Sequence, residues 1–463
     1  YKMKSNILFL IIDSLRADKV SDSGNNSVTS NLDYIKKNGV FFDHAISSSD
    51  GTVLSYAGLF SAKHPFKTGM RSEKLTKLRD TISYFEVLKN YDYNLYGYLP
   101  KIAETLEIIP EFENNDESFL DLLPDALSKA GEITLKRLEG GMKEPWCFLI
   151  HVDNTHFPIK KPKGFEDEKF GSNNYEKQLS ATDVWIGKIL EKIDLEKTLV
   201  VIIGDHGSYI QSLKNESLQI DFQDNANAQN NIVKVSRRIP KFADPLKLKL
   251  FLMREHINKK RKQSKIQKLD LKPHEIRELL DQRSNPDRFL FDEKIRVPIF
   301  LIGSKINHGI TISKQVRLID VFPTICEIIG IPKWEEEVDG ISLYPLLENK
   351  KIGDLTAYIE STPGVEIETN NVIGIRTDKY KYFRNRYSKN LDVHLFDLEN
   401  DPFEDENIAK KSKNLVEIME KKLNEITNGF SLEGNDYSNN KMDKQSTREI
   451  KNVRQMFKDM GYT

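Results

Sequence analysis

Short apolar runs of strand length recur along this chain, and they constrain its fold more than any other feature. The runs cover 7–12, 146–152, 199–203 and 297–302, and polar or turn residues bound each of them. Such runs are typical of strands that are covered on both faces, as in parallel sheets. Stretches with a helical period lie between them, at 30–37, 54–61, 81–89, 121–138, 175–193 and 316–329. This alternation predicts an α/β domain with a doubly wound, mostly parallel sheet.

The remaining segments predict an insertion, a second unit and a tail. The 463 residues suffice for one large core and a smaller unit. From about 208 to 287 the chain is Asn/Gln-rich and then basic, with apolar residues at helical spacing, so we expect a helical insertion with a solvated basic face within a large domain of 1–350. Strand patterns at 372–377 and 379–384 and a helical pattern at 407–426 predict an α+β C-terminal subdomain over 351–430, and 431–463 is expected to be an extended tail.

Charge and cysteine content exclude several classes of protein. The 69 basic and 70 acidic side chains give a net charge of -1, so we expect no nucleic-acid partner. We also expect no transmembrane segment, because the first apolar run stops at Asp13. Cys147 and Cys326 are flanked by apolar residues, so we expect buried free thiols and favour the cytoplasm. An extracytoplasmic location is expected instead if the sequence is a trimmed fragment.

Chemically active side chains stand where the predicted strands end. Asp13 follows the first run, Asp205 and His206 follow the third, and 151–156 closes the second. A single carboxylate after a strand is usually a helix cap or turn residue. Two such ends at the same edge of a parallel sheet, one of them an Asp-His pair, instead indicate ligands for a divalent cation. The hydroxyl of Thr52, at the predicted start of a helix, could complete the site as a metal-activated nucleophile.

Several short sequence motifs follow one another along the chain in a fixed order. Segment 6–18 contains Asp13, segment 52–65 starts with Thr52 and ends in an Ala-x-x-Pro turn, segment 151–158 contains His156, and 204–207 reads Gly-Asp-His-Gly. Segments 291–298, 320–324, 338–343, 395–402 and 460–462 continue it. Over nearly the whole chain, this pattern resembles the sulfatase branch of the alkaline phosphatase superfamily.

The resemblance implies an alkaline-phosphatase-like fold and a single-metal esterase site. By position, Asp13, Asp205 and His206 would hold one divalent cation and Thr52 would bind it as the nucleophile. His156 would contact the non-bridging oxygens of the ester or help the leaving group depart. Mn, Zn or Mg is favoured over Ca, although Asp-His pairs also serve Ca.

Three departures from the family pattern bear on the chemistry. Ser14 stands where many sulfatases have a second Asp, and no lysine aligns before the Arg-Val-Pro strand, where Arg288 is a neighbouring candidate. Thr52 stands where sulfatases have a cysteine or serine that is oxidised to formylglycine. Because threonine carries a methyl group on Cβ, it cannot become an aldehyde. Threonine is instead the nucleophile of phosphatases, phosphodiesterases and phosphotransferases of the superfamily.

We therefore expect a metal-dependent hydrolase or transferase that cleaves a phosphodiester or phosphomonoester. The substrate would be a small-molecule, glycan-linked or lipid-linked anionic ester. One alternative is a sulfuric ester hydrolase that works without formylglycine, and another is a non-catalytic protein that binds an anionic glycan through the basic insertion. Asp153 and His156 could also form part of a second cation site, whereas His151 is expected to be a strand residue and not a ligand.

Overall fold

The computed structural model describes most of the chain. The described ranges are 4–21, 26–70, 83–105, 107–109, 112–120, 129–157, 159–214, 218–223, 260–262, 264–280, 287, 289–306, 309–332, 337–362 and 369–427. The predicted tail at 431–463, Arg288 and much of the predicted insertion lie outside these ranges.

A large, mostly parallel sheet forms the centre of the molecule. Its strands run in the order β10-β2-β9-β6-β1-β5-β3-β4, with β11 paired to β2. The central strand β1 is parallel to both β5 and β6, and β9 is antiparallel to both of its neighbours. The strands are β1 Asn6–Ile12, β2 Val40–Ile46, β3 Asn94–Pro100, β4 Phe119–Leu120, β5 Trp146–Val152, β6 Thr198–Gly204, β9 Arg296–Gly303, β10 Ile310–Ile312 and β11 Val316–Arg317. The predicted fold class is confirmed.

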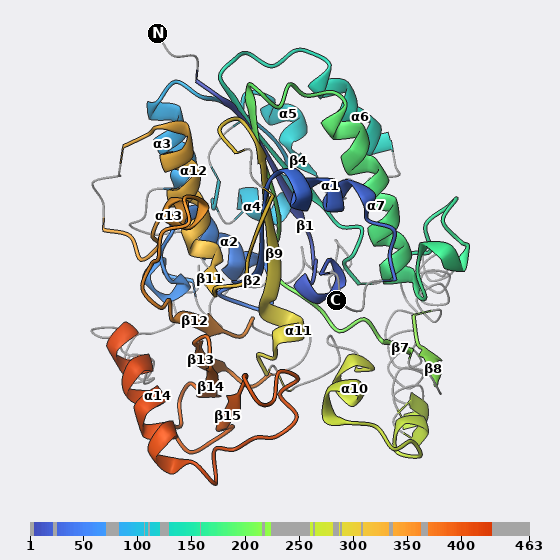
Figure 1. Cartoon of the computed structure of the whole chain (residues 1–463), viewed down its shortest axis with the longest axis vertical. Helices are drawn as coiled ribbons and strands as arrows, with labels where there is room; N and C mark the ends of the chain where they lie inside the picture. The colour runs from blue at the N-terminus through green and yellow to red at the C-terminus, as the bar shows by residue number, and fades with distance from the viewer. Residues whose placement is uncertain are drawn as a thin grey trace, which may run out of the picture.

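Helices cover both faces of this sheet, as Figure 1 shows. One face carries α2 Thr52–Ser61, α3 Tyr84–Asn90, α12 Val321–Ile329 and α13 Tyr344–Leu347; the other carries α1 Ser30–Asn38, α6 Lys129–Leu138 and α7 Asn174–Leu190. The short helices α4 Lys101–Thr105 and α5 Asn115–Ser118 lie next to β3 and β4. Since every strand of the sheet centre is covered twice, the apolar runs are explained by burial on both sides.

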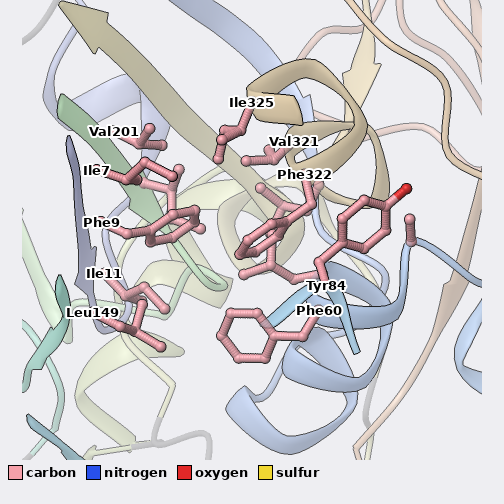
Figure 2. Packing of buried hydrophobic residues seen from close by; sticks show 14 of the residues in the cluster. Ile7, Phe9, Ile11, Phe60, Tyr84, Leu149, Val201, Val321, Phe322 and Ile325 are labelled. Carbon is pink, nitrogen blue, oxygen red and sulfur yellow. The ribbon is translucent and has the colours of Figure 1, made fainter. Parts of the chain in front are cut away.

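Alternate side chains of β1 point into two separate cores. Ile7, Phe9 and Ile11 pack with α2, α3 and α12, whereas Leu8, Leu10 and Ile12 pack with α1 and α7. On the first side, the ring of Phe322 stacks on Phe9 with 5.3 Å between centroids, and it also contacts Phe60 and Tyr84 (Figure 2). Phe322 contacts Phe85 as well. This aromatic cluster fixes α2 against the sheet.

A smaller antiparallel sheet lies beyond the end of the large one. It contains β12 Ala357–Glu360, β13 Val372–Arg376, β14 Tyr380–Asn385 and β15 His394–Asp397, and α14 Lys413–Ile426 packs on it. Glu360 N donates to Ser48 O at 2.9 Å, so this sheet touches the loop that precedes α2. The other described elements are β7 Ser212–Lys214, β8 Gln219–Asp221, α10 Pro273–Glu278 and α11 Asp292–Ile295.

Two predicted helices begin later than expected. The helical stretch predicted at 316–329 starts with strand β11, because Val316 and Arg317 pair with β2. A 3-10 turn follows, capped by the side chain of Asp320, which accepts hydrogen bonds from Arg317 N and Nε at 3.0 Å. The helix predicted from 407 begins at Lys413, since Asn407 Oδ1 accepts from Leu395 N at 3.0 Å and ties that segment to β15.

Two other expectations concern the cysteines and membrane-spanning helices. Cys147 and Cys326 are buried free thiols, as expected. Among the helices that the structure describes, none combines the length and apolar character required to cross a bilayer.

Replacing Phe322 with alanine should lower the free energy of unfolding by about 3–5 kcal/mol, because it empties the centre of the aromatic cluster. Guanidinium denaturation measures the change. Ile418→Ala, at a position that is 53% exposed, is the control and should stay within about 0.5 kcal/mol of the unmodified protein. Equal losses in the two variants would contradict this account of the core.

Candidate metal centre and active site

Three neighbouring strands deliver polar side chains to one edge of the sheet. Strands β6, β1 and β5 are adjacent and parallel, so their carboxyl ends meet at the same edge. Asp13 follows β1, Asp205 and His206 follow β6, and His151 lies opposite Ile11 near the end of β5. The structure therefore brings together the predicted strand-end residues.

Asp13 is the centre of this group and is fully buried. Its Oδ1 accepts from Ser14 Oγ at 2.8 Å and lies 3.5 Å from His206 Nε2, and its Oδ2 lies 3.1 Å from His151 Nε2. Burial alone would raise the pKa of Asp13, but the charge of His156, the hydrogen bond from His151 and the charge of His206 lower it overall. Asp13 is thus a carboxylate that is held ionised.

Asp205 has one carboxylate oxygen that accepts no hydrogen bond from the described residues. Its Oδ1 accepts from Ser14 N at 3.1 Å and from His206 N at 2.8 Å, whereas its buried Oδ2 has no hydrogen-bond partner among the described residues. Ser14 adopts φ 61°, and this turn of the backbone aims its N–H at Asp205. A buried carboxylate oxygen without a partner is costly unless a cation binds it.

His206 directs its second ring nitrogen, Nε2, toward the two carboxylates. Its Nδ1 lies 2.8 Å from Gly207 O and donates to that carbonyl, so Nε2 keeps its lone pair for a ligand. Nε2 lies 3.6 Å from Asp205 Oδ2. Burial lowers the pKa of His206, but the charges of Asp205 and Asp13 raise it above its usual range.

Thr52 faces this nitrogen from the first turn of α2. Its Oγ1 lies 3.2 Å from His206 Nε2. Helix α2 is held in place by Ser55 Oγ, which donates to Asp205 O at 2.7 Å. Gly51 precedes Thr52 in an extended conformation, and a Cβ there would lie 2.4 Å from Thr362 Oγ1. The start of α2 is therefore fixed from two sides.

These donors fit the divalent cation that the sequence predicts. Suitable atoms of Asp13, His151 and Asp205 lie within 4.8 Å of one another, and His206 and Thr52 adjoin them. Two carboxylates, imidazole nitrogen and a hydroxyl form a mixed oxygen and nitrogen donor set for a divalent metal. The assignment of individual ligands stays a prediction.

His156 acts electrostatically on Asp13, and a second cation site formed by Asp153 and His156 gains no support. The charge of His156 lowers the pKa of Asp13, and the backbone N–H of His156 donates to Asp153 O at 3.0 Å. Within the described ranges, Asp153 belongs to no group of three side chains that could hold a metal.

Two pairs of residues near the site were not predicted from the sequence. His151 is a strand residue as expected, but it also contacts Asp13, and its Nδ1 forms a short hydrogen bond with Tyr56 OH. Lys294, in the helical turn before β9, is 1% exposed, and its Nζ lies 2.5 Å from Asp50 Oδ2. A lysine two residues before Arg296 was the available signal.

The Lys294 pair links the Gly-Asp-His-Gly turn to the loop before Thr52. Lys294 O accepts from Gly207 N at 2.7 Å, and a Cβ on Gly207 would lie 2.2 Å from Glu293 O. Only glycine allows this close approach. The buried cation of Lys294 thus sits between both segments that carry predicted ligands.

Comparison with known proteins decides the family. The sequence profile of the sulfatase family matches residues 5–331, and that of the N-sulphoglucosamine sulphohydrolase C-terminal region matches residues 264–429. The chain belongs to the sulfatase family. Members of this family are metal-dependent hydrolases of ester bonds, typically with Ca or Mg.

Relatives and solved structures agree with this membership. Human arylsulfatase K is 29% identical over 146 residues, which cover 30% of this chain and 27% of that protein, so the match spans about a quarter of the relative. An ulvan-active sulfatase of Formosa agariphila is 22% identical over 94% of this chain and 82% of its own.

Two solved structures share the fold. That of BT4656 in complex with its substrate D-glucosamine-2-N,6-O-disulfate aligns with a TM-score of 0.61 at 16% identity, covering 93% of this chain and all of that chain. A phosphonate monoester hydrolase of Agrobacterium radiobacter aligns with a TM-score of 0.61 at 14% identity, covering 91% and 95%.

Adding Mn²⁺ should raise the unfolding midpoint, because a bound cation neutralises the two buried carboxylates; at 100 times the dissociation constant the gain is about 2.7 kcal/mol. Thermal unfolding with EDTA and with Mn²⁺ measures the shift. Asp205→Asn should remove most of it, whereas Asp183→Asn, at a buried carboxylate that accepts from Asn31 N and Leu32 N, should keep it. A full shift in Asp205→Asn would contradict the site.

Replacing Lys294 with methionine should lower the free energy of unfolding by about 3–5 kcal/mol, because the buried carboxylate of Asp50 loses its cation. Adding Asp50→Asn should recover part of the loss in a double-mutant cycle measured by denaturation. The exposed pair Lys379 and Glu399 is the control, and Lys379→Met should cost less than about 1 kcal/mol. Equal costs in the two single variants would contradict a buried ion pair.

Proposed function

We propose that this chain hydrolyses a phosphoric ester and that Thr52 is its nucleophile. The observation that carries the proposal is the position of the Thr52 hydroxyl, on the first turn of α2 and 3.2 Å from His206 Nε2. That nitrogen lies 3.5 Å from Asp13 Oδ1 and 3.6 Å from Asp205 Oδ2. The hydroxyl reaches the point where the candidate metal ligands converge. An activated hydroxyl in this position can attack an anionic ester in line.

The residue type sets the kind of intermediate. Thr52 cannot be converted to formylglycine, and neither Cys147 in β5 nor Cys326 in α12 stands at the nucleophile position. Attack by Thr52 Oγ1 on phosphorus forms a phosphothreonine, breaks the bond to the substrate oxygen and releases the alcohol. A water molecule then attacks phosphorus, frees the Thr52 hydroxyl and releases phosphate or its monoester. Transfer to another alcohol in place of water would make the same site a phosphotransferase.

The surrounding side chains have separable roles in this proposal. Asp13, Asp205, His206 and Thr52 would hold the cation, which would lower the pKa of the attacking hydroxyl and offset negative charge on the ester. His156, whose charge acts at Asp13, would contact a non-bridging oxygen or protonate the departing alcohol. Asp50 and Lys294 hold the loop before Thr52 in place.

A sulfuric ester is the second candidate substrate, and the named relatives favour it. Arylsulfatase K and the ulvan-active sulfatase are sulfatases, and BT4656 binds a sulfated glucosamine. A phosphonate monoester hydrolase shares the fold, which is consistent with the first candidate. In both cases we propose an anionic ester on a glycan or another small molecule as the substrate, and we retain the cytoplasm as the proposed location.

Turnover of three p-nitrophenyl esters separates these candidates. The unmodified protein with Mn²⁺ should hydrolyse p-nitrophenyl phosphate or bis-p-nitrophenyl phosphate faster than p-nitrophenyl sulfate. Thr52→Ala should lower kcat by at least about 10³-fold, because the nucleophile is lost, whereas Thr52→Ser keeps a hydroxyl and should retain measurable turnover.

The other outcomes are equally informative. Preferred turnover of the sulfate ester would support the second candidate, and full activity in Thr52→Ala would contradict the nucleophile assignment. Binding of Mn²⁺ without turnover of any ester would favour a non-catalytic glycan-binding protein.

A further inference from the structure

We propose that His151 is an additional ligand of the cation and that Tyr56 orients it. This inference rests on the metal site in the proposed function and adds a second imidazole to it. It also bears on which cation the site selects.

The strand register places His151 at the centre. His151 lies opposite Ile11 in the pairing of β5 with β1. Ile11 is two residues before Asp13, so the side chain of His151 emerges beside that carboxylate. Its Nε2 lies 3.1 Å from Asp13 Oδ2. Ligand atoms of Asp13, His151 and Asp205 all lie within 4.8 Å of one another, a separation that one metal ion can span.

Burial of these groups supplies a second, independent observation. Asp13, His151 and Asp205 are each fully buried, and Asp205 Oδ2 has no hydrogen-bond partner among the described residues. The orphaned oxygen belongs to the same three-residue group as His151 Nε2. A cation shared by that oxygen and the imidazole would satisfy both.

Tyr56 gives His151 the arrangement that metal-bound histidines have. Tyr56 is fully buried in α2, and its hydroxyl forms a short hydrogen bond with His151 Nδ1. The two rings meet edge to face, with 5.7 Å between centroids. When a bound cation replaces the Nε2–H that donates to Asp13, and Nδ1–H donates to the tyrosine oxygen, Nε2 carries the lone pair that a metal requires. An oxygen partner on the second nitrogen is the rule for such ligands.

A second imidazole changes the selectivity of the site. With His151 and His206 the donor set contains two nitrogens, two carboxylates and the hydroxyl of Thr52. Ca²⁺ prefers oxygen ligands, whereas imidazole suits transition metals such as Zn²⁺ and Fe²⁺. Ser14 contributes a hydroxyl where many family members have a further carboxylate, which also reduces the oxygen donors available to Ca²⁺. The site should therefore favour a transition metal.

Pulsed electron paramagnetic resonance of the Mn²⁺-loaded full chain tests this proposal by counting directly bound histidine nitrogens. The unmodified protein should show two, His151→Gln should show one, and His64→Gln should show two. His64 is the matched control because it is a buried histidine that packs on Phe66 and Tyr358. A single bound nitrogen in the unmodified protein would overturn the proposal without any variant.

Calorimetric titration supplies a second readout. His151→Gln should weaken Mn²⁺ binding by about 10–100-fold while changing Ca²⁺ binding far less, and Tyr56→Phe should weaken Mn²⁺ binding in the same direction. Equal losses for both ions in His151→Gln, with both nitrogens still bound, would show that His151 only holds Asp13 by a hydrogen bond and would overturn the proposal.

Turnover on the same samples separates this inference from the proposed function. An unmodified protein that binds Mn²⁺ through two nitrogens but hydrolyses no ester would support ligation by His151 and contradict the proposed function alone.

Discussion

Two buried carboxylates, Asp13 and Asp205, constrain the rest of this structure more than any other pair of groups. Each is fully buried at the edge of a sheet whose strands are themselves buried on both faces. Such charges are tolerated only with hydrogen bonds and positive charge close by. The N–H groups of Ser14 and His206 satisfy one oxygen of Asp205, and imidazoles surround Asp13. The second oxygen of Asp205 accepts no hydrogen bond from the described residues, which is the physical basis for expecting a cation.

Contacts between distant segments hold the start of α2 next to these carboxylates. Ser55 of α2 bonds the carbonyl of Asp205, and the aromatic cluster around Phe322 presses α2 onto the sheet. Lys294 brings a buried cation to Asp50, two residues before Thr52, while its own carbonyl accepts from Gly207. The position of the Thr52 hydroxyl is therefore fixed by packing, by hydrogen bonds and by an ion pair, as a reactive group requires.

Much of the fold and of the site could be predicted from short-range patterns. Apolar runs that end in Asp13 and in Asp205-His206 indicated parallel strands with ligands at one edge, and the structure brings these residues together. The predicted helix starts were wrong where a side-chain hydrogen bond fixes the backbone before the helix, as Asp320 does before α12 and Asn407 does before α14. Such hydrogen bonds depend on the local path of the backbone, which helical periodicity does not record.

The sequence alone determined the class of sheet, the order of the motifs and the presence of threonine in place of an oxidisable residue, because these depend on residue type and local spacing. Only the tertiary structure decided that His151 faces Asp13, that Tyr56 adjoins it and that Lys294 pairs with Asp50. Each of these contacts joins residues far apart in the chain. Strand register and helix packing place them, so no pattern in a single segment could reveal them.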